Sequence, residues 1–271
     1  MSSDDFKRML AVLIRVSVCT IDILGGEPTL HPDIVTFVRD ALASGLSVNI
    51  SSNGSNLNVL EEIASMGPRV TVGISINDRA TLEQAGAFIQ AHSAVVKSVF
   101  NPNMDRGIIL DILSLKPEKY YLIYRDVLDR SALLAAIPFP QFASAVEQHF
   151  PSEQVGTVFC SGFVPDKEGP PELAQVRCPA GTTKLGVLPD GSVYPCNLFF
   201  GQKEFFLGNL LSEPFSDIWQ HRTLAYFRSP VQNPCARTSC RLYARCHGGC
   251  PAHSFVLTND LAAPDPRCSG V

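Results

Sequence analysis

The sequence predicts an α/β protein in which a partial barrel of parallel strands precedes a small cysteine-rich domain. Over residues 2–128, apolar patterns with helical spacing alternate with short strand-like runs, which is typical of repeated βα units. Seven of the nine cysteines lie from Cys178 onward, so the C-terminal part differs chemically from the rest. The expected strand ends recur every 24 to 27 residues, the length of one βα unit, at Gly26, Asn53, Asn77, Asn101 and Arg125.

Local signals predict the individual elements. Ser3-Asp4-Asp5 offers an N-cap for a first helix, with apolar positions at Phe6, Met9, Leu10, Leu13 and Ile14. Pro32 suits the first turn of a second helix, which Gly45 can close in the left-handed conformation. Two further helices are expected around residues 57–64, ended by Gly67, and around 82–89. The expected strands are 16–24, 46–51, 70–76, 95–100 and 120–124.

The periodic pattern stops after Asp129. Residues 132–150 are helix-like but interrupted by two prolines, and the Pro- and Gly-rich residues 165–171 are interpreted as a hinge. From Arg177 on, the chain has short β-like pieces and little helix except around residues 215–227. We therefore expect a partial barrel in 1–130, a helical and loop linker in 131–175 and a cysteine-rich domain in 176–271.

The sequence alone does not fix the order of the strands in the sheet. At least five βα units fit a full or partial barrel better than a short open sheet, but an open doubly wound sheet satisfies the same periodicity. In either case, polar residues just past the strands are where a ligand would lie.

Composition excludes several classes of protein. Hydrophobic residues make up 45% and charged residues 18%, which supports a packed core rather than disorder. The net charge of −4 does not favour a nucleic-acid or anionic-membrane partner. The apolar runs are too short to span a bilayer, and the N-terminal residues lack the pattern of a signal peptide. We expect a soluble cytoplasmic protein that binds neither nucleic acid nor membrane.

The clustered cysteines predict a metal centre. In a reducing compartment, thiols grouped among Gly and Pro are more often metal ligands than disulfides. Four thiolates around one iron–sulfur cluster is the usual count, so seven fill one such site and leave three for a second. Cys160, another side chain or an open iron would complete the second site. Zinc is the competing metal, with His247 as a candidate fourth ligand, and spacing alone does not separate the two.

Three motifs follow neighbouring strands. In Gly25-Gly26-Glu27-Pro28, the glycines allow a sharp turn and Glu27 suits a ligand ammonium group. Ser51-Ser52-Asn53-Gly54 and Ser75-Ile76-Asn77-Asp78 present hydroxyl and amide groups that suit a ribose or a carboxylate. Taken alone, the first motif is equally explained by a plain βα turn, and helix capping explains the other two better, but three on adjacent strand ends favour a shared ligand.

These residues resemble a known family. Leu24-Gly25-Gly26-Glu27-Pro28, followed by Leu30-His31-Pro32-Asp33, resembles the GGEP region of radical S-adenosylmethionine (radical SAM) enzymes. The C-terminal cysteines are similar to the SPASM extension of that family, together with Asp190–Cys196, Leu207–Leu210, Ile218-Trp219 and Cys246–Pro251. The resemblance implies a partial (β/α)6 TIM-like barrel with a SPASM domain, and it favours iron–sulfur over zinc.

The resemblance also implies roles for individual residues. Gly25, Gly26, Glu27 and Pro28 would line the amino group of S-adenosylmethionine, and Ser52, Asn53, Ser75 and Asn77 would lie near its carboxylate and ribose. One auxiliary [4Fe–4S] cluster would be held by Cys178, Cys196 and Cys250, with Cys160 as a candidate fourth ligand. A second would be held by Cys235, Cys240, Cys246 and Cys268. Asn197 stands where some relatives place an aspartate as a suspected base.

One family motif is absent from the sequence. No CxxxCxxC triad precedes Gly25, so we expect the barrel to lack its first strand, to leave a sheet edge open and not to initiate radical chemistry as presented. The resemblance implies a peptide- or protein-modifying maturase in the intact form, with a peptide or protein substrate and an electron donor. The alternatives are a degenerate, non-catalytic iron–sulfur binding or electron-transfer partner and a zinc-stabilised binding module.

Overall fold

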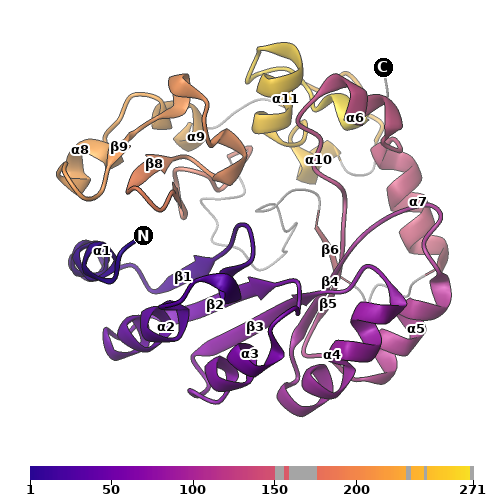
Figure 1. The fold of residues 1–271 in the computed structure, drawn as a ribbon. Coiled ribbons are helices and arrows are strands. Elements are labelled where there is room, and N and C mark those ends of the chain that lie inside the picture. Colours follow the sequence, from indigo (N-terminus) through magenta and orange to yellow (C-terminus); the bar gives the residue numbers. More distant parts are fainter. Residues whose placement is uncertain (150–155, 159–175, 230–232, 241–242, 269–271) are drawn as a thin grey trace. The chain divides into compact units, whose positions relative to one another are not determined.

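The structure is a computed structural model that describes residues 1–149, 156–158, 176–229, 233–240 and 243–268 (Figure 1). It divides into two compact units. The first comprises Met1–Leu122 and Gly156, and the second comprises Ile123–His149 and the chain from Thr157 onward. The predicted division into 1–130, 131–175 and 176–271 stays a prediction, and the predicted hinge at residues 165–171 lies outside the described residues.

The predicted α/β fold with a parallel sheet is confirmed. Its six strands follow one another in chain order. They are β1 (Thr20–Ile23), β2 (Ser47–Ser52), β3 (Val70–Ser75), β4 (Val95–Val99), β5 (Tyr120–Ile123) and β6 (Gly156–Val158). The first four pair parallel. Sequential order is that of a barrel, because a doubly wound sheet reverses its order at a switch point.

Helices alternate with these strands as the periodicity predicts. They are α1 (Ser3–Arg15), α2 (Ile34–Ala43), α3 (Leu57–Ala64), α4 (Arg79–His92) and α5 (Arg106–Ser114). The sequence interpretation did not include α5 or β6. It also began the second helix at Pro32, whereas a 3₁₀ turn (Pro28–Leu30) comes first and α2 starts at Ile34.

The N-terminal region shows how local chemistry shifts the predicted boundaries. The cap of α1 is Ser2, whose hydroxyl accepts the Asp5 N–H, rather than Ser3. Ile14 is exposed although its spacing suggests the apolar face. Ser17 adopts a left-handed conformation (φ 58°), so the predicted strand 16–24 shortens to β1. Cys19, which lies inside the expected strand 16–24, consequently precedes the observed strand and is exposed.

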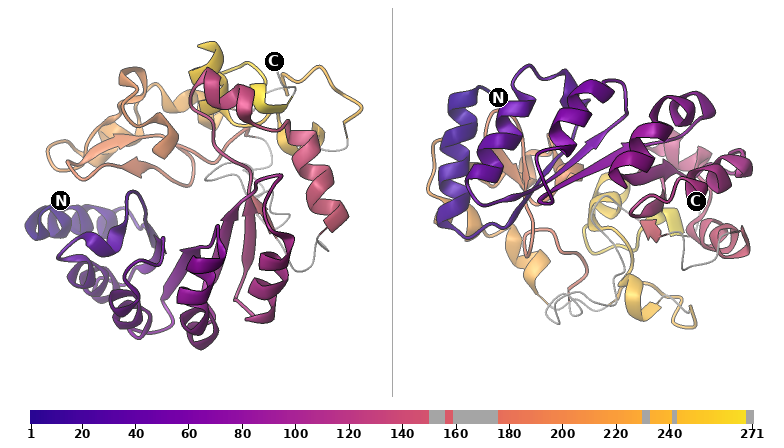
Figure 2. Two further views of the ribbon diagram at one scale, coloured as in Figure 1. Left: turned by 45° about the vertical axis from the view of Figure 1, so that its right-hand side comes forward. Right: turned by 90° about the horizontal axis from the view of Figure 1, so that it is seen from below.

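The two faces of the sheet differ in chemistry. Helices α2, α3 and α4 cover one face (Figures 1 and 2), where strand side chains are buried, including Val48, Ile50, Val72, Ile74 and Val96. Because side chains alternate along a strand, the register places the intervening residues together on the opposite, inner face. The inner face of β1–β4 carries Asp22, Asn49, Ser51, Thr71 and Lys97.

The second unit is built from short elements. Its helices are α6 (Arg130–Ala135), α7 (Phe139–His149), α8 (Phe215–Trp219), α9 (Leu224–Arg228), α10 (Tyr243–Cys246) and α11 (Pro251–Thr258). A small antiparallel sheet contains β7 (Gly186–Val187), β8 (Ser192–Tyr194) and β9 (Gly208–Asn209). Helix α11 was not expected from the sequence. Throughout the described part of the chain, no helix has the length and apolar character needed to cross a membrane.

Candidate cofactor-binding sites

The Gly25–Pro28 motif forms a carboxylate site at the end of β1. Gly25 and Gly26 have positive φ angles of 88° and 46°, a conformation that favours glycine. The following residue, Glu27, is half-buried, and its Oε1 accepts the Thr29 N–H at 3.0 Å and the Thr29 hydroxyl at 2.7 Å. The turn therefore fixes the orientation of this carboxylate.

Residues at the end of β2 complete the support of Glu27. The Ser52 hydroxyl donates to Oε1 at 2.8 Å, and the Asn53 N–H donates to Oε2 at 2.7 Å. Burial raises the pKa of Glu27, but the hydrogen bonds from Asn53, Thr29 and Ser52 outweigh it and hold the pKa below its usual value. The carboxylate is thus ionised and oriented, which suits a ligand ammonium group.

The other predicted ligand residues also serve the backbone. The Asn53 Oδ1 accepts the Ser55 N–H at 2.9 Å, and the Asn77 Oδ1 accepts the Val99 N–H at 2.8 Å. Ser52 is buried, so its hydroxyl positions Glu27. Ser75 pairs in register with Lys97 and therefore belongs to the inner face. The sequence interpretation missed Thr29, although a hydroxyl two residues after an acid is a common turn signal.

Apart from Cys19, the described cysteines form two thiol groups, both in the second unit. The first thiol group is Cys178, Cys196 and Cys250, whose charges act on one another's pKa values. The second thiol group is Cys235, Cys240, Cys246 and Cys268. The charges of Cys235 and Cys240 raise the pKa of Cys268, and the charge of Cys268 raises that of Cys246. Cys160 lies outside the described residues.

The thiols suit a cluster of metal atoms. Burial and then the neighbouring thiols raise the pKa values of Cys178 and Cys196 to about 12, and burial is likewise the largest cause for Cys246, at about 11. Such thiols ionise when a bound cation offsets the cost. No three His, Cys, Asp or Glu side chains among the described residues converge on a single metal ion. In a [4Fe–4S] cluster, each thiolate binds a different iron atom, so the ligands lie further apart.

A cavity of about 50 Å³ lies against the second thiol group. Cys235, Cys246 and Cys268 line it, and so does Cys250 of the first thiol group. Gly248 and Gly249 on its wall have positive φ angles of 87° and 82°. A Cβ on Gly249 would collide with the Cβ of Asp265, so the loop before Cys250 requires glycine there.

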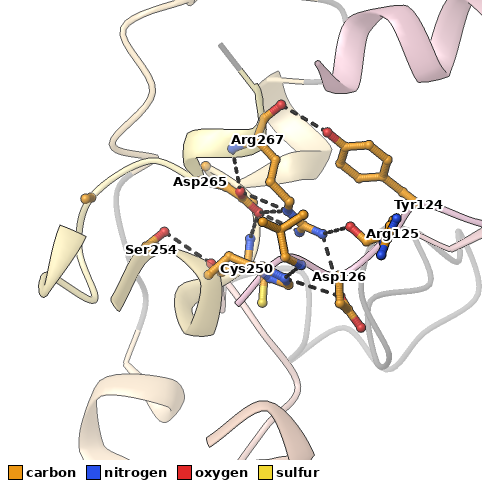
Figure 3. A network of polar contacts seen from close by, with 12 residues as sticks. Tyr124, Arg125, Asp126, Cys250, Ser254, Asp265 and Arg267 are labelled. Carbon is orange, nitrogen blue, oxygen red and sulfur yellow. Dashed lines mark hydrogen bonds and ion pairs between the residues drawn. The ribbon is translucent and has the colours of Figure 1, made fainter. Parts of the chain in front are cut away.

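Asp265 and Arg267 form a buried ion pair beside Cys250 (Figure 3). Asp265 accepts the Cys250 N–H at 3.1 Å and the Arg267 Nη2 at 2.7 Å, and Arg267 directly precedes Cys268. The Arg267 guanidinium lies over the Tyr124 ring, 4.9 Å from its centroid. Burial disfavours both charges, but their attraction outweighs it, lowering the pKa of Asp265 and raising that of Arg267. The hydrogen bond from the Cys250 N–H to Asp265 therefore joins the Cys250 and Cys268 segments, and Arg267 stabilises the carboxylate that accepts it.

Asp126 and His253 extend this network. The sequence analysis assigned no role to His253. His253 is fully buried, and its Nε2 accepts the Val127 N–H at 3.0 Å. The Asp126 Oδ1 lies 3.4 Å from this Nε2 and 3.6 Å from Arg267 Nη1. Burial raises the pKa of Asp126 to about 6, against the lowering effect of Arg267. The Asp126 carboxylate, just after the strand end expected at Arg125, thus faces a buried network.

Arg177 organises the loops around the first thiol group. It is 1% exposed and directly precedes Cys178. Its guanidinium donates to the carbonyls of Gly248, Gly249, Leu261 and Ala263, and to the hydroxyls of Tyr226 and Ser254. It therefore binds the loops on both sides of α11 to the Cys178 segment. No sequence pattern identified this residue, because its partners are mainly backbone carbonyls.

Comparison with known proteins finds a matching domain family, similar sequences and a similar fold. The SPASM family, an iron–sulfur cluster-binding domain, matches residues 178–251. The mycofactocin maturase MftC of Mycolicibacterium smegmatis is 26% identical over 99% of this chain and 75% of its own length. The PqqA peptide cyclase of Rhodopseudomonas palustris is 23% identical over 99% of this chain and 78% of its own. Streptococcus suis SuiB bound to S-adenosylmethionine superposes with a TM-score of 0.74 and 18% identity, covering 99% of this chain and 70% of SuiB.

The fold and the thiol groups together define an α/β partial-barrel protein with an iron–sulfur domain at its C-terminal side. Residues 178–251 match the SPASM family, and nearly the whole chain is similar to MftC and to SuiB, in agreement with the sequence resemblance to radical SAM enzymes with a SPASM extension. The zinc-stabilised module is thereby disfavoured, because the matching domain is one that binds iron–sulfur clusters.

Proposed function

We propose that the chain binds S-adenosylmethionine and two auxiliary [4Fe–4S] clusters as part of a maturase that modifies a peptide. The observation that carries this proposal is the match over 99% of the chain to proteins named for peptide maturation and peptide cyclisation. A solved structure of SuiB contains its precursor peptide SuiA, and SuiB matches 99% of this chain with a TM-score of 0.72. An electron donor and a cytoplasmic location are part of the same proposal.

The S-adenosylmethionine site would lie at the strand ends of the first unit. Glu27, presented by Gly25, Gly26 and Pro28, would accept hydrogen bonds from the ligand ammonium group. The support for this role is an ionised carboxylate whose orientation is fixed by donors that the chain itself supplies. The roles of Ser52, Asn53, Ser75 and Asn77 near the carboxylate and ribose rest on the resemblance.

The two thiol groups would hold the auxiliary clusters. Cys178, Cys196 and Cys250 would ligate one cluster, with Cys160 as the candidate fourth ligand. The other would be ligated by Cys235, Cys240, Cys246 and Cys268. Such clusters supply an electron acceptor or a binding point for substrate. The Asp265–Arg267 pair would keep the two ligand segments together.

A second candidate is a non-catalytic iron–sulfur partner of an active enzyme. The SPASM match over residues 178–251 supports iron–sulfur binding by this candidate as well. Neither proposal assigns radical initiation to any residue of this chain. Formation of 5′-deoxyadenosine under strong reductant would contradict the second candidate.

Anaerobic cluster reconstitution tests the proposal. We expect on the order of eight iron and eight sulfide per chain, and about half of each after Cys196→Ala or after Cys246→Ala. Stoichiometric zinc without acid-labile sulfide would contradict the cluster assignment.

S-adenosylmethionine should bind the reconstituted chain. Glu27→Gln should weaken this binding about tenfold or more, because a charged hydrogen-bond acceptor is lost. Glu62→Gln, which alters an exposed acid of the same unit, is the matched control.

A further inference from the structure

The inner face of the sheet is unusually polar for the inside of a barrel. Barrel interiors are normally filled by layers of branched apolar side chains. Here, the register aligns Asp22 with Asn49 and Asn49 with Thr71, while Ser51 aligns with Gly73 and Ser75 with Lys97. Most of these side chains are only half-buried, and Asp22 is exposed. Such a face gains little from apolar packing and is suited to polar partners.

Lys97 is the cation of this face, and the sheet provides room for it. Its ammonium donates to the Ser51 hydroxyl at 2.6 Å, two strands away. To reach Ser51, the side chain crosses β3 at Gly73, where an added Cβ would lie 3.2 Å from both Cε and Nζ. The glycine therefore leaves the space through which Lys97 extends across the inner face.

The charge of Lys97 has no close counterion among the described residues. Burial lowers its pKa, and Asp22 acts in the opposite direction from a distance. Within the described part of the chain, no carboxylate oxygen forms an ion pair with Nζ. Asp22 is itself engaged, since its Oδ1 accepts from the Asn49 amide at 2.7 Å. Lys97 is thus a partly desolvated ammonium group with donor capacity left for an anion.

We propose that Lys97 anchors a carboxylate of the peptide substrate on the inner face, with Ser51 and Gly73 positioning the ammonium. This inference rests on the proposed peptide-modifying function and names the substrate chemistry. A carboxylate matches a half-buried cation beside a hydroxyl group, and it supplies the counterion. Both the C-terminal carboxylate of a peptide and an acidic side chain carry this group, and the test separates them.

The test measures binding of three randomised tripeptide pools to the reconstituted full-length chain, with an uncharged dye as label. One pool has a free C-terminal carboxylate, one is amidated but contains glutamate, and one is amidated and neutral. We expect wild-type protein to prefer one carboxylate pool, and which one it prefers identifies the source. Lys97→Met should remove that preference, a loss of roughly tenfold, whereas Lys97→Arg should retain most of it. Lys119→Met, at an exposed lysine of the same unit, should leave the preference unchanged.

The outcomes separate the two proposals. Equal binding of all three pools by wild-type protein, or an unchanged preference after Lys97→Met, would overturn the carboxylate anchor and leave the peptide function standing. Absence of binding by any pool would count against the peptide function itself. Weaker S-adenosylmethionine binding after Lys97→Met would assign Lys97 to that ligand's carboxylate and overturn the inference. An unchanged melting temperature shows that the variant is folded.

Discussion

The two units of the molecule reach a stable structure by different means. In the first unit, four parallel strands pack apolar side chains such as Val48 and Ile74 against helices, and both residues are fully buried. In the second unit, short elements surround buried thiols, and Arg177 and Arg267 are almost fully buried. Buried charges, thiolates included, are unfavourable unless they are paired or bound to metal. The first unit should therefore be stable by burial alone, whereas the second depends on hydrogen bonds and iron.

Removal of iron gives the largest expected difference between the units. Chelation of the reconstituted protein should abolish hydrogen-exchange protection around α11 and residues 248–268, because metal binding stabilises a domain with little apolar core. Strands β2–β4 should keep their protection. Equal loss in both units, measured by hydrogen exchange with mass spectrometry, would show that the first unit also depends on the clusters.

Arg177→Met should have the next largest effect. The substitution leaves buried carbonyls, including those of Gly248 and Ala263, without a donor, and should destabilise the second unit by about 3–5 kcal/mol. Reconstituted iron should fall while the first unit remains folded. Arg222→Met at an exposed site is the control. Full iron content with unchanged urea unfolding would refute the organising role of Arg177.

Leu60→Ala tests the first unit in the same way. Leu60 is fully buried on α3, and removing its side chain should lower the free energy of unfolding by about 2–5 kcal/mol. Because the change lies in the apolar core, iron and sulfide per folded chain should not change. Loss of iron from the remaining folded protein would show that cluster binding depends on the core of the first unit.

Gly249→Ala probes close packing in the second unit with a smaller expected cost. The new Cβ meets Asp265 in a backbone conformation with positive φ, which should cost about 1–3 kcal/mol and shift the Cys250 segment. Gly201→Ala is a matched control, since its φ is 81° but nothing lies within 4 Å of the added Cβ. Comparable loss of iron in the two variants would attribute the effect to backbone strain rather than to contact with Asp265.

The sequence predicted far more of the first unit than of the second. Strands β2 to β5 lie within about a residue of their expected bounds, because an apolar run between helices leaves little freedom. Helix α11 was missed, because its residues His253 and Ser254 are buried polar groups that interrupt any apolar period. The Glu27 site was predicted as an acid at a strand end, but its support by Ser52 and Thr29 was not.

By itself, the sequence determined the βα repeat, the glycines of the strand-end turn and the presence of clustered thiols, because these depend on local periodicity and residue type. The tertiary structure decided which residues share a face or a site. It brought Cys178 and Cys196 near Cys250, joined Asp265 to Arg267, and extended Lys97 across Gly73 to Ser51. These contacts join segments or define side-chain directions that spacing along the chain does not specify. Their energies arise from burial and charge pairing, which exist only once the chain has folded.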